Sequence, residues 1–421
     1  MKFSFKRPQA TEVVSTEKKL IGVRGAMWRA HVDAAGVVRP TDGSATVSWQ
    51  IAAADQWHDP AREPSTRQKW YAGTPVVETR VRVPGGDVAA RIFCVADLGG
   101  MTLWEFENES ASPVVVGFSR SDVLTSVPSS PPIGTDLPSG SIAVPLGHRG
   151  ITRIGLLHSR PHTGRLPDDV PRAPAVVRGW ETAAEVPSRL VLPDHALSSH
   201  IVETRTQLLL NDQLLKDQLL KDLIDLSPHL VVERMRLGET GNEWEMDLSR
   251  VAEDVVTSQR RRSHVSWDTP WLLTNIAAVA RRLGDEMLAD DVAAAMLRLA
   301  DRDIEDVPQA SSDRATSIAW AESTLVRPSL AGGRCTLFPG GVPRTWWGQS
   351  FEWHRIAADA TRTVSAAVRW HGARPALLWE TSGPAGLVID SAAAEPSWHT
   401  TLPSGETLLL EPVAVDDAVS N

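Results

Sequence analysis

The sequence predicts an α+β protein of several domains, in which a large antiparallel β-sandwich precedes a short α-helical block and a second β-sandwich. The first observation is the hydrophobic period, which is about two residues up to Leu192, about 3.6 from there to Pro328, and about two again afterwards. The second is the length of 421 residues, which exceeds what one hydrophobic core usually supports. We therefore predict domains at 1–194, 195–328 and 329–421, the last of them either separate or packed with the helical block.

The N-terminal region contains short runs of alternating or β-branched apolar residues, which predict roughly a dozen strands. A tight turn at Pro84-Gly85-Gly86-Asp87 separates two of them. Residues 126–139 and 160–174 are rich in Pro, Ser and Gly, and they predict long surface loops. The expected strands include 45–53, 76–83, 87–96, 101–108, 114–118, 141–145, 152–158 and 176–185.

A long helix is expected from a cap at Ser198 or Ser199 to about Leu226, where Ser227 and Pro228 stop it. Within it, residues 211–225 read NDQLLKDQLLKDLID, a repeat of five residues. Five residues advance about 140° beyond one helical turn, so the leucine pairs cover most of the helix surface. We expect this helix either to be buried in the core or to pair with a second copy in a homo-oligomer.

Three further helices complete the predicted helical block: 248–261, 269–283 and 285–306. The second has Asp268 or Thr269 as its cap and Pro270 in its first turn, and Gly284 ends it. The block as a whole carries four or five helices between about residues 196 and 325.

The C-terminal region returns to β structure. Apolar residues alternate with polar ones over 363–370, and 376–380 is again extended, so the two form a hairpin around 371–375. A strand at 386–390 and a second hairpin over 398–411, turning at Pro403-Ser404-Gly405, complete the predicted sandwich.

Composition excludes several functional classes. Apolar residues make up 42% of the chain and charged residues 23%, and no run approaches the roughly 20 apolar residues of a membrane helix. The N-terminal MKFSFKRPQATEVV lacks the apolar core of a secretory signal, so we expect a cytoplasmic protein. The net charge is −9 and no basic stripe with aromatic residues is present, which argues against a nucleic-acid partner.

Cysteine and tryptophan usage is informative. Cys94 and Cys335 both lie among apolar neighbours, which favours two buried reduced thiols, and no spacing indicates a metal site or a cofactor motif. The chain has 16 Trp against one Tyr. Such an excess indicates either flat binding platforms or ordinary core residues, and the sequence leaves both interpretations open.

Several phrases resemble the β-sandwich domains of glycoside hydrolases of the six-hairpin class, those with an (α/α) toroid. In the N-terminal half these are VETRVRVPGGD at 77–87 and LWEFENES at 103–110. In the C-terminal half FEWH at 351–354, VRWHG at 368–372 and LWE at 378–380 look like the closing sandwich of actinobacterial glycosidase-like proteins. The resemblance implies a partial toroid, since about 130 residues cannot supply twelve helices, and an oligosaccharide ligand.

Glycoside hydrolysis needs two carboxyl groups across the scissile bond. The strongest candidates lie in 238–247, expected to be a Gly-containing loop between helices, where Glu243 and Glu245 flank Trp244. Acids are equally common at helix N-termini, so this pattern also fits the start of the next helix. Glu322, near Trp320 at the end of the helical block, is a further catalytic candidate.

Sugar recognition needs aromatic faces with planar polar groups beside them. Adjacent Trp346 and Trp347 lie in a Gly-rich stretch near Glu352, and at most one of the pair needs to be functional. The candidate substrate-binding residues are Trp244, Trp267, Trp271, Trp346, Trp347, Glu352 and His354.

Three functional hypotheses follow. The chain is a glycoside-hydrolase-like enzyme acting on an oligosaccharide, a non-catalytic carbohydrate-binding or regulatory relative that has lost the toroid, or a scaffold whose helix around 214–224 docks a partner.

Overall fold

The computed structural model describes residues 19–217, 227–238, 242–310 and 315–412, without the side chains of 211–217 and 242–245. It is an α+β protein with several β-sheets, as predicted. The chain folds into two compact units. The first consists of Met1–Ala183 with Val202–Leu219, and the second of Ala184–Ile201 with Leu220–Asn421. We describe each unit by itself.

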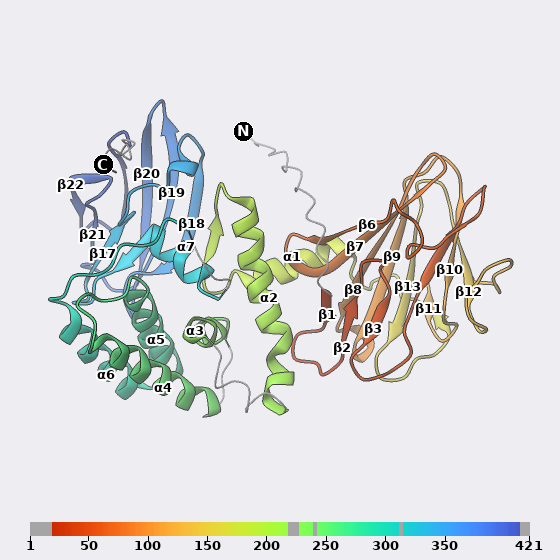
Figure 1. Cartoon of the computed structure of the whole chain (residues 1–421), viewed down its shortest axis with the longest axis horizontal. Coiled ribbons are helices and arrows are strands. Elements are labelled where there is room, and N and C mark those ends of the chain that lie inside the picture. The colour runs from red at the N-terminus through yellow and green to blue at the C-terminus, as the bar shows by residue number, and fades with distance from the viewer. Residues whose placement is uncertain (1–18, 218–226, 239–241, 311–314, 413–421) are drawn as a thin grey trace, which may run out of the picture. The chain divides into compact units, whose positions relative to one another are not determined.

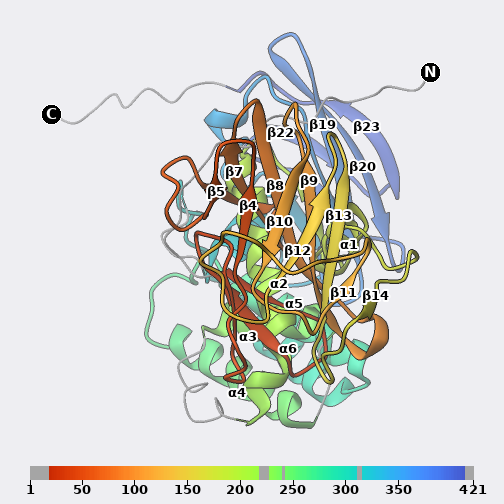
Figure 2. The same ribbon diagram turned by 90° about the vertical axis from the view of Figure 1, so that its right-hand side faces the viewer.

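The first unit is an antiparallel β-sandwich (Figures 1 and 2). Its main sheets have seven strands in the order β14-β11-β13-β9-β8-β7-β6 and four in the order β12-β10-β4-β5, and a third sheet has the order β1-β2-β3. The strands are β1 Lys19–Gly22, β2 Arg29–Val32, β3 Val38–Pro40, β4 Trp49–Ala52, β5 Trp57–His58, β6 Arg67–Tyr71, β7 Thr74–Val83, β8 Gly86–Val95, β9 Met101–Asn108, β10 Val114–Phe118, β11 Leu124–Thr125, β12 Ile142–Leu146, β13 Ile151–Leu157 and β14 Gly164–Arg165.

Aromatic residues from facing sheets fill the sandwich core. Trp49 of β4 lies edge-on to Phe106 of β9 at 5.3 Å between ring centroids, and Trp104 of β9 lies edge-on to Phe118 of β10 at 4.9 Å. All four side chains are buried. The alternation that predicted these strands therefore does place the apolar residues between two sheets.

The β7–β8 hairpin confirms the predicted turn. Val83 pairs with Gly86, so Pro84 and Gly85 form a two-residue connection in which Gly85 has a φ of +78°. A Cβ atom at Gly86 would lie 2.5 Å from the Cα of Ser110, which explains the second glycine.

One predicted strand of this region is wrong. Residues 176–185 lie in helix α1, Ala173–Ala184. Its buried residues Ala173, Val177, Trp180 and Ala184 repeat at helical spacing. The β-branched pair Val176-Val177 is typical of a strand, but Pro174 falls in the first turn, where proline fits a helix.

Helix α2 spans His195–Asp217. It starts earlier than predicted, because the side chain of Asp194 accepts a hydrogen bond from Leu197 N at 2.9 Å and caps the helix in place of Ser198 or Ser199. The side chains of the Leu-rich repeat at 211–225 lie outside the described residues. Burial or self-association of that repeat therefore remains a prediction.

The helices of the second unit are α3 Pro228–Arg236, α4 Asn242–Gln259, α5 Thr269–Leu283, α6 Glu286–Leu299 and α7 Ser317–Leu325. Helix α5 has the predicted bounds, with Pro270 in its first turn and Gly284 left-handed after its end. Pro228 begins α3 rather than only stopping the preceding helix. Helix α4 begins at Asn242, six residues before the predicted start, so 242–247 belong to a helix and not to a loop.

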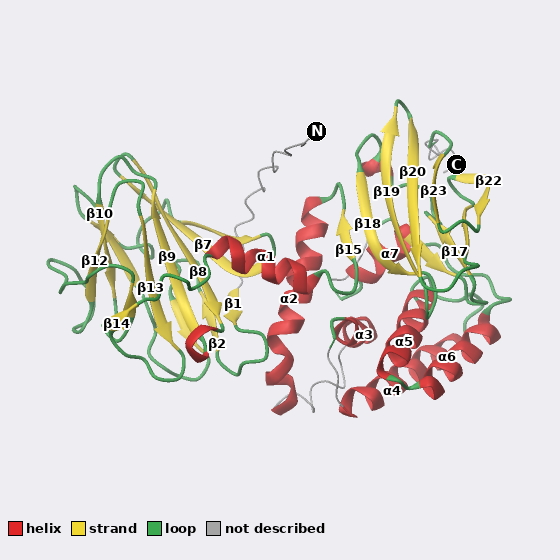
Figure 3. Cartoon of the chain, turned by 180° about the vertical axis from the view of Figure 1, so that it is seen from behind, coloured by secondary structure: helices red, strands yellow, loops and turns green. Residues whose placement is uncertain are grey.

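Two sheets complete the second unit (Figure 3), with the orders β15-β18-β19-β20-β23 and β16-β17-β21-β22. Their strands are β15 Arg189–Val191, β16 Val326–Pro328, β17 Arg334–Leu337, β18 Phe351–Ala357, β19 Thr363–His371, β20 Arg374–Ser382, β21 Val388–Ser391, β22 Glu395–Thr400 and β23 Ser404–Leu408. The predicted hairpin around 371–375 is confirmed, and its turn is shorter, because His371 pairs directly with Arg374.

The predicted hairpin over 398–411 is wrong. Strand β22 pairs with β21, whereas β23 pairs with β20 in the other sheet. The physical reason is Trp379 of β20, whose Nε1 donates to Leu402 O at 3.2 Å and whose ring leaves room only for the glycine at position 405. The chain is thereby directed from one sheet to the other.

The helices and both sheets of the second unit share one hydrophobic core. Buried residues such as Trp271 of α5, Leu337 of β17 and Trp353 of β18 belong to the same cluster. The helical block and the C-terminal strands therefore lie in one compact unit, and the domain boundaries at 194 and 328 remain sequence-based predictions. Among the described helices, none combines the length and the apolar character needed to cross a membrane.

Candidate functional site

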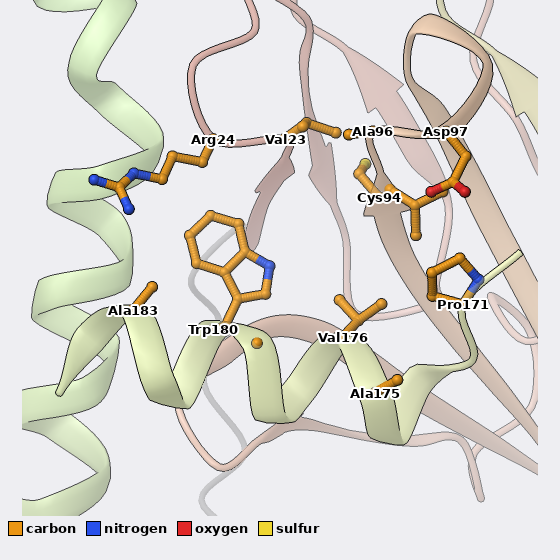
Figure 4. A pocket seen from close by; sticks show the side chains of 12 residues that line it. Val23, Arg24, Cys94, Ala96, Asp97, Pro171, Ala175, Val176, Trp180 and Ala183 are labelled. Carbon is orange, nitrogen blue, oxygen red and sulfur yellow. The ribbon is translucent and has the colours of Figure 1, made fainter. Parts of the chain in front are cut away.

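The first unit contains a pocket of about 350 Å³ beside helix α1 (Figure 4). Three separate segments line it: the loop after β1, the end of β8 with the turn that follows, and one face of α1. The lining residues are Val23, Arg24, Cys94, Val95, Ala96, Asp97, Pro171, Ala175, Val176, Gly179, Trp180 and Ala183.

Helix α1 supplies an aromatic wall. Figure 4 shows Trp180 and Val176 rising from the helix toward the loop that carries Val23 and Arg24. Because Val176, Trp180 and Ala183 are three or four residues apart, they share one helical face. Gly179 leaves the helix surface open beside the indole, with no atom within 4 Å of an added Cβ.

The opposite wall is the loop from Val23 to Trp28, and Arg29 fixes its shape. The buried Arg29 guanidinium donates from Nη1 to Val23 O at 3.1 Å, to Ala26 O at 2.6 Å and to Trp28 O at 2.8 Å. Its Nε donates to Leu210 O of helix α2 at 2.7 Å. Because one guanidinium binds three carbonyl groups of this loop, the loop holds its shape without a ligand.

The floor contains Cys94 within a polar chain. The Cys94 thiol lies 3.5 Å from Thr102 Oγ1, which lies 3.0 Å from His158 Nε2. Burial raises the pKa of Cys94 to about 12, so it remains a neutral thiol, as the sequence predicted for a buried cysteine. Burial also lowers the pKa of His158 to about 4, with Asp42 opposing and Arg29 adding to the shift.

Two charged residues complete the rim of the pocket. Asp97 begins the turn Asp97–Gly99 after β8, and both it and Arg24 are exposed. The pocket thus combines an indole and aliphatic walls with one carboxylate and one guanidinium. It offers a neutral thiol in place of a thiolate nucleophile, so the arrangement suits binding rather than covalent chemistry.

The structure places Glu322 and Trp271 together in the core of the second unit. Glu322 of α7 accepts hydrogen bonds from Trp271 Nε1 at 2.8 Å, from Arg236 Nη2 at 2.9 Å to each carboxylate oxygen, and from Ser188 Oγ at 2.5 Å. Its side chain has no exposed surface.

The charge of Glu322 is balanced within this cluster. Burial opposes the ionised form of Arg236, but Glu233 and Glu322 outweigh it and raise the pKa of Arg236 above its ordinary value. A carboxylate that accepts four hydrogen bonds and is closed to solvent cannot reach a substrate to donate a proton to it. Trp271, likewise buried, offers no exposed aromatic face.

The two adjacent tryptophans, Trp346 and Trp347, differ in burial, as expected for neighbouring residues. Trp346 is buried in the core beside Phe351, with 5.2 Å between ring centroids. Trp347 is half-buried and donates from Nε1 to Val342 O at 2.9 Å. Trp267 is also half-buried and packs against the core.

Glu352 and His354 lie two residues apart on β18, so both side chains are on the outward face of its sheet. His354 Nε2 is 3.4 Å from Glu352 Oε1, and Arg369 donates to Glu352 Oε2 at 3.0 Å. Burial raises the pKa of Glu352, but these hydrogen bonds outweigh it and hold the pKa below its ordinary value. This carboxylate is therefore also tuned to stay ionised.

Glu243, Trp244 and Glu245 have side chains outside the described residues. Their backbone forms the first turn of α4, which is the helix N-terminus that sequence analysis kept as an alternative. Among the described side chains of the candidates, Glu322 accepts a hydrogen bond from Trp271, and Glu352 lies within 3.4 Å of His354.

Sequence reasoning missed Arg24, Asp97 and Trp180. Their positions are far apart in the chain, and Trp180 lay in a segment predicted as a strand. The helical spacing of Val176, Trp180 and Ala184 was the available signal.

Comparison with known proteins adds little. No family model matches the chain. No curated protein matches it either. One solved structure, a putative kojibiose phosphorylase from the human microbiome, is similar at 7% identity over 93% of this chain and 92% of that chain, with a TM-score of 0.34. A likeness this distant carries no argument about the site. Within the described residues, no group of three or more His, Cys, Asp or Glu side chains could hold a metal ion.

Proposed function

We propose that the protein binds carbohydrate without hydrolysing it, and that the ligand occupies the pocket beside helix α1. The observation that carries the proposal is the indole of Trp180 in the pocket wall, with the Asp97 carboxylate at the rim and the Arg24 side chain beside it, its guanidinium directed away from the indole. The C–H face of a sugar ring packs on an indole, while its hydroxyl groups hydrogen-bond to carboxylate and guanidinium groups. The resemblance of the sequence to carbohydrate-active sandwiches agrees with this assignment.

The size of the pocket supports a small ligand. Its volume of about 350 Å³ lies at the low end of the range of roughly 300–1,000 Å³ for small-molecule sites. This volume fits one sugar ring, with the rest of a longer ligand outside.

Hydrolysis is the less favoured activity. It needs two carboxyl groups roughly 5 to 10 Å apart across the scissile bond. Glu322 is closed to solvent, and Glu352 is paired with Arg369 on an open sheet face. Glu243 and Glu245 remain predicted catalytic candidates. If they are catalytic, an oligosaccharide is cleaved by the wild type and not by Glu243→Gln.

Isothermal titration tests the binding proposal. The probes are glucose, galactose, mannose, maltose and cellobiose, with adenine as a planar aromatic ligand that contains no sugar ring. We expect at least one sugar to bind and Trp180→Leu to weaken it by about tenfold or more, since an aromatic contact contributes about 0.5–1.5 kcal/mol beyond area burial. Trp57→Leu is the matched control, because Trp57 is a half-buried tryptophan of the same unit outside the pocket lining.

Two results would overturn the proposal. One is binding of adenine with no response to any sugar, which would assign the pocket to planar aromatic ligands. The other is a sugar affinity that is equal in the wild type and in a folded Trp180→Leu protein, which would place the sugar elsewhere.

A further inference from the structure

We infer that the ligand site continues past the pocket onto Trp28, so that the ligand is an oligosaccharide with a second ring on that indole. This inference rests on the proposed function and deepens it. It concerns the outer part of the site, where Trp28, Met27 and Leu98 lie next to the rim residues Arg24 and Asp97 in sequence.

Trp28 is held as a platform. Its ring stacks on the imidazole of His158 with 3.8 Å between centroids and 10° between planes. His158 is fixed in turn by Thr102, whose Oγ1 is 3.0 Å from its Nε2, and by its own backbone N–H, which donates to Gly100 O at 3.0 Å. A half-buried indole already ordered by a stacked neighbour loses little conformational entropy when a ligand packs on it.

The platform and the pocket belong to one loop. Arg24 and Trp28 are four residues apart, so their Cα atoms are at most about 14 Å from each other. Ala26 N donates to Val23 O at 3.1 Å, which turns the loop, and the Arg29 guanidinium binds carbonyls at both ends of it. These hydrogen bonds therefore fix the backbone positions of Arg24 and Trp28 relative to each other.

A second connection runs along the other rim. Asp97 O accepts a hydrogen bond from Gly100 N at 3.0 Å, and Gly100 O accepts one from His158 N. A Cβ atom at Gly100 would lie 2.9 Å from His158 Nδ1, so only glycine permits this approach. The rim carboxylate and the stacked histidine are thus parts of one hydrogen-bonded turn.

Exposed aliphatic side chains adjoin both parts of the site in sequence. Met27, which precedes Trp28, is 55% exposed, and Leu98, which follows Asp97, is 56% exposed. Exposed aliphatic groups beside a carboxylate and a guanidinium match the alternating C–H and hydroxyl surfaces of linked sugar rings. A ligand of one ring would leave this surface unused.

The test compares ligand length in two variants. Affinities of glucose, maltose, maltotriose, cellobiose and cellotriose are measured by isothermal titration for the wild type, Trp28→Leu and Trp180→Leu. We expect Trp28→Leu to weaken a disaccharide and a trisaccharide by about tenfold and to leave the monosaccharide within about twofold. Trp180→Leu is expected to weaken all ligand lengths.

Conservative and neighbouring variants separate recognition from folding. Trp28→Phe keeps a ring and is expected to restore most of the disaccharide affinity, and His158→Ala removes the stacked support and is expected to lower it. Equal losses for mono- and disaccharides in Trp28→Leu would overturn the second subsite while leaving the proposed function intact. No binding of any sugar to the wild type would overturn both.

Discussion

His158 is a half-buried histidine that the protein keeps neutral. Burial lowers its pKa from the ordinary 6.5 to about 4. Between these two values the unfolded chain binds a proton that the folded chain excludes, so the folded state loses stability as the pH falls from 6.5 towards 4.

The first prediction concerns this pH dependence. The free energy of unfolding of the wild type should fall between pH 6.5 and 4 by up to about 3 kcal/mol more than that of His158→Gln, less whatever solvent screening removes. Urea unfolding of both proteins across this pH range gives the difference. Parallel curves for the two proteins would show that His158 titrates normally.

Glu322 shows how a residue's surroundings decide its role. As a carboxylate near a tryptophan it looked like a catalytic acid, yet it is buried against Arg236, Trp271 and Ser188. Removing one partner of a buried ion pair leaves the other charge uncompensated.

The second prediction follows from that burial. Glu322→Ala should lower the free energy of unfolding by about 3–5 kcal/mol, because the buried Arg236 would keep only Glu233 as a counter-charge and the buried donors of Trp271 and Ser188 would lose their acceptor. The control is Glu352→Ala, which removes a partly exposed carboxylate and should cost at most about 1 kcal/mol. A loss no larger for Glu322→Ala than for the control would contradict the structural role.

At the scale of elements, the sequence predicted boundaries correctly where proline and glycine mark both the start and the end of a helix or a turn. Pro270 and Gly284 bracket helix α5 at the predicted residues, and Pro84 with Gly85 turns the β7–β8 hairpin as expected. These boundaries depend on backbone conformations that only a few residue types favour.

Elements whose state depends on distant packing were not predictable in the same way. Helix α1 contains β-branched residues and is a helix because Ala173 and Val177 pack together into the core of the first unit. Strand β23 does not pair with β22, because Trp379, more than twenty residues earlier in the chain, donates a hydrogen bond to Leu402 O just before β23 begins. Neither contact can be derived from residues close in the chain.

The third prediction uses Gly179, which lines the pocket, and Gly22, which precedes the lining residue Val23. A Cβ atom at Gly22 would lie 2.6 Å from Arg29 Cδ, so Gly22→Ala should displace that guanidinium and destabilise the unit by about 1–3 kcal/mol. Gly179→Ala in α1 meets no atom within 4 Å and should stabilise the helix by about 0.5–1 kcal/mol. Thermal unfolding of both variants checks the signs, and destabilisation by Gly179→Ala would contradict the helix or its packing.

At the scale of the whole molecule, the sequence was sufficient for the fold class. The change of hydrophobic period from two to 3.6 and back matches strands, then helices, then strands in the structure. The sharing of one core by the helical block and the C-terminal sheets was left open by the sequence. Whether two regions share a core depends on which apolar faces pack against each other. Hydrophobic periodicity predicts which face of an element is apolar, but it does not predict which other element packs on that face.

The candidate site was the least predictable feature. Its walls come from Val23–Arg24, from Cys94–Asp97 and from Pro171–Ala183, which only the folded sandwich brings together. The tryptophans that stood out in sequence, such as Trp346 and Trp271, are largely core residues. An excess of tryptophan therefore indicated a protein that uses indole rings widely, without indicating which ring meets a ligand.

A crystal structure of the wild-type protein grown with a disaccharide tests the central claim most directly. The disaccharide is the one that binds most tightly in titration. The account requires one sugar ring in the pocket against Trp180, with its hydroxyl groups near Arg24 and Asp97. Electron density for the sugar elsewhere, with the pocket beside helix α1 containing only solvent, would contradict it.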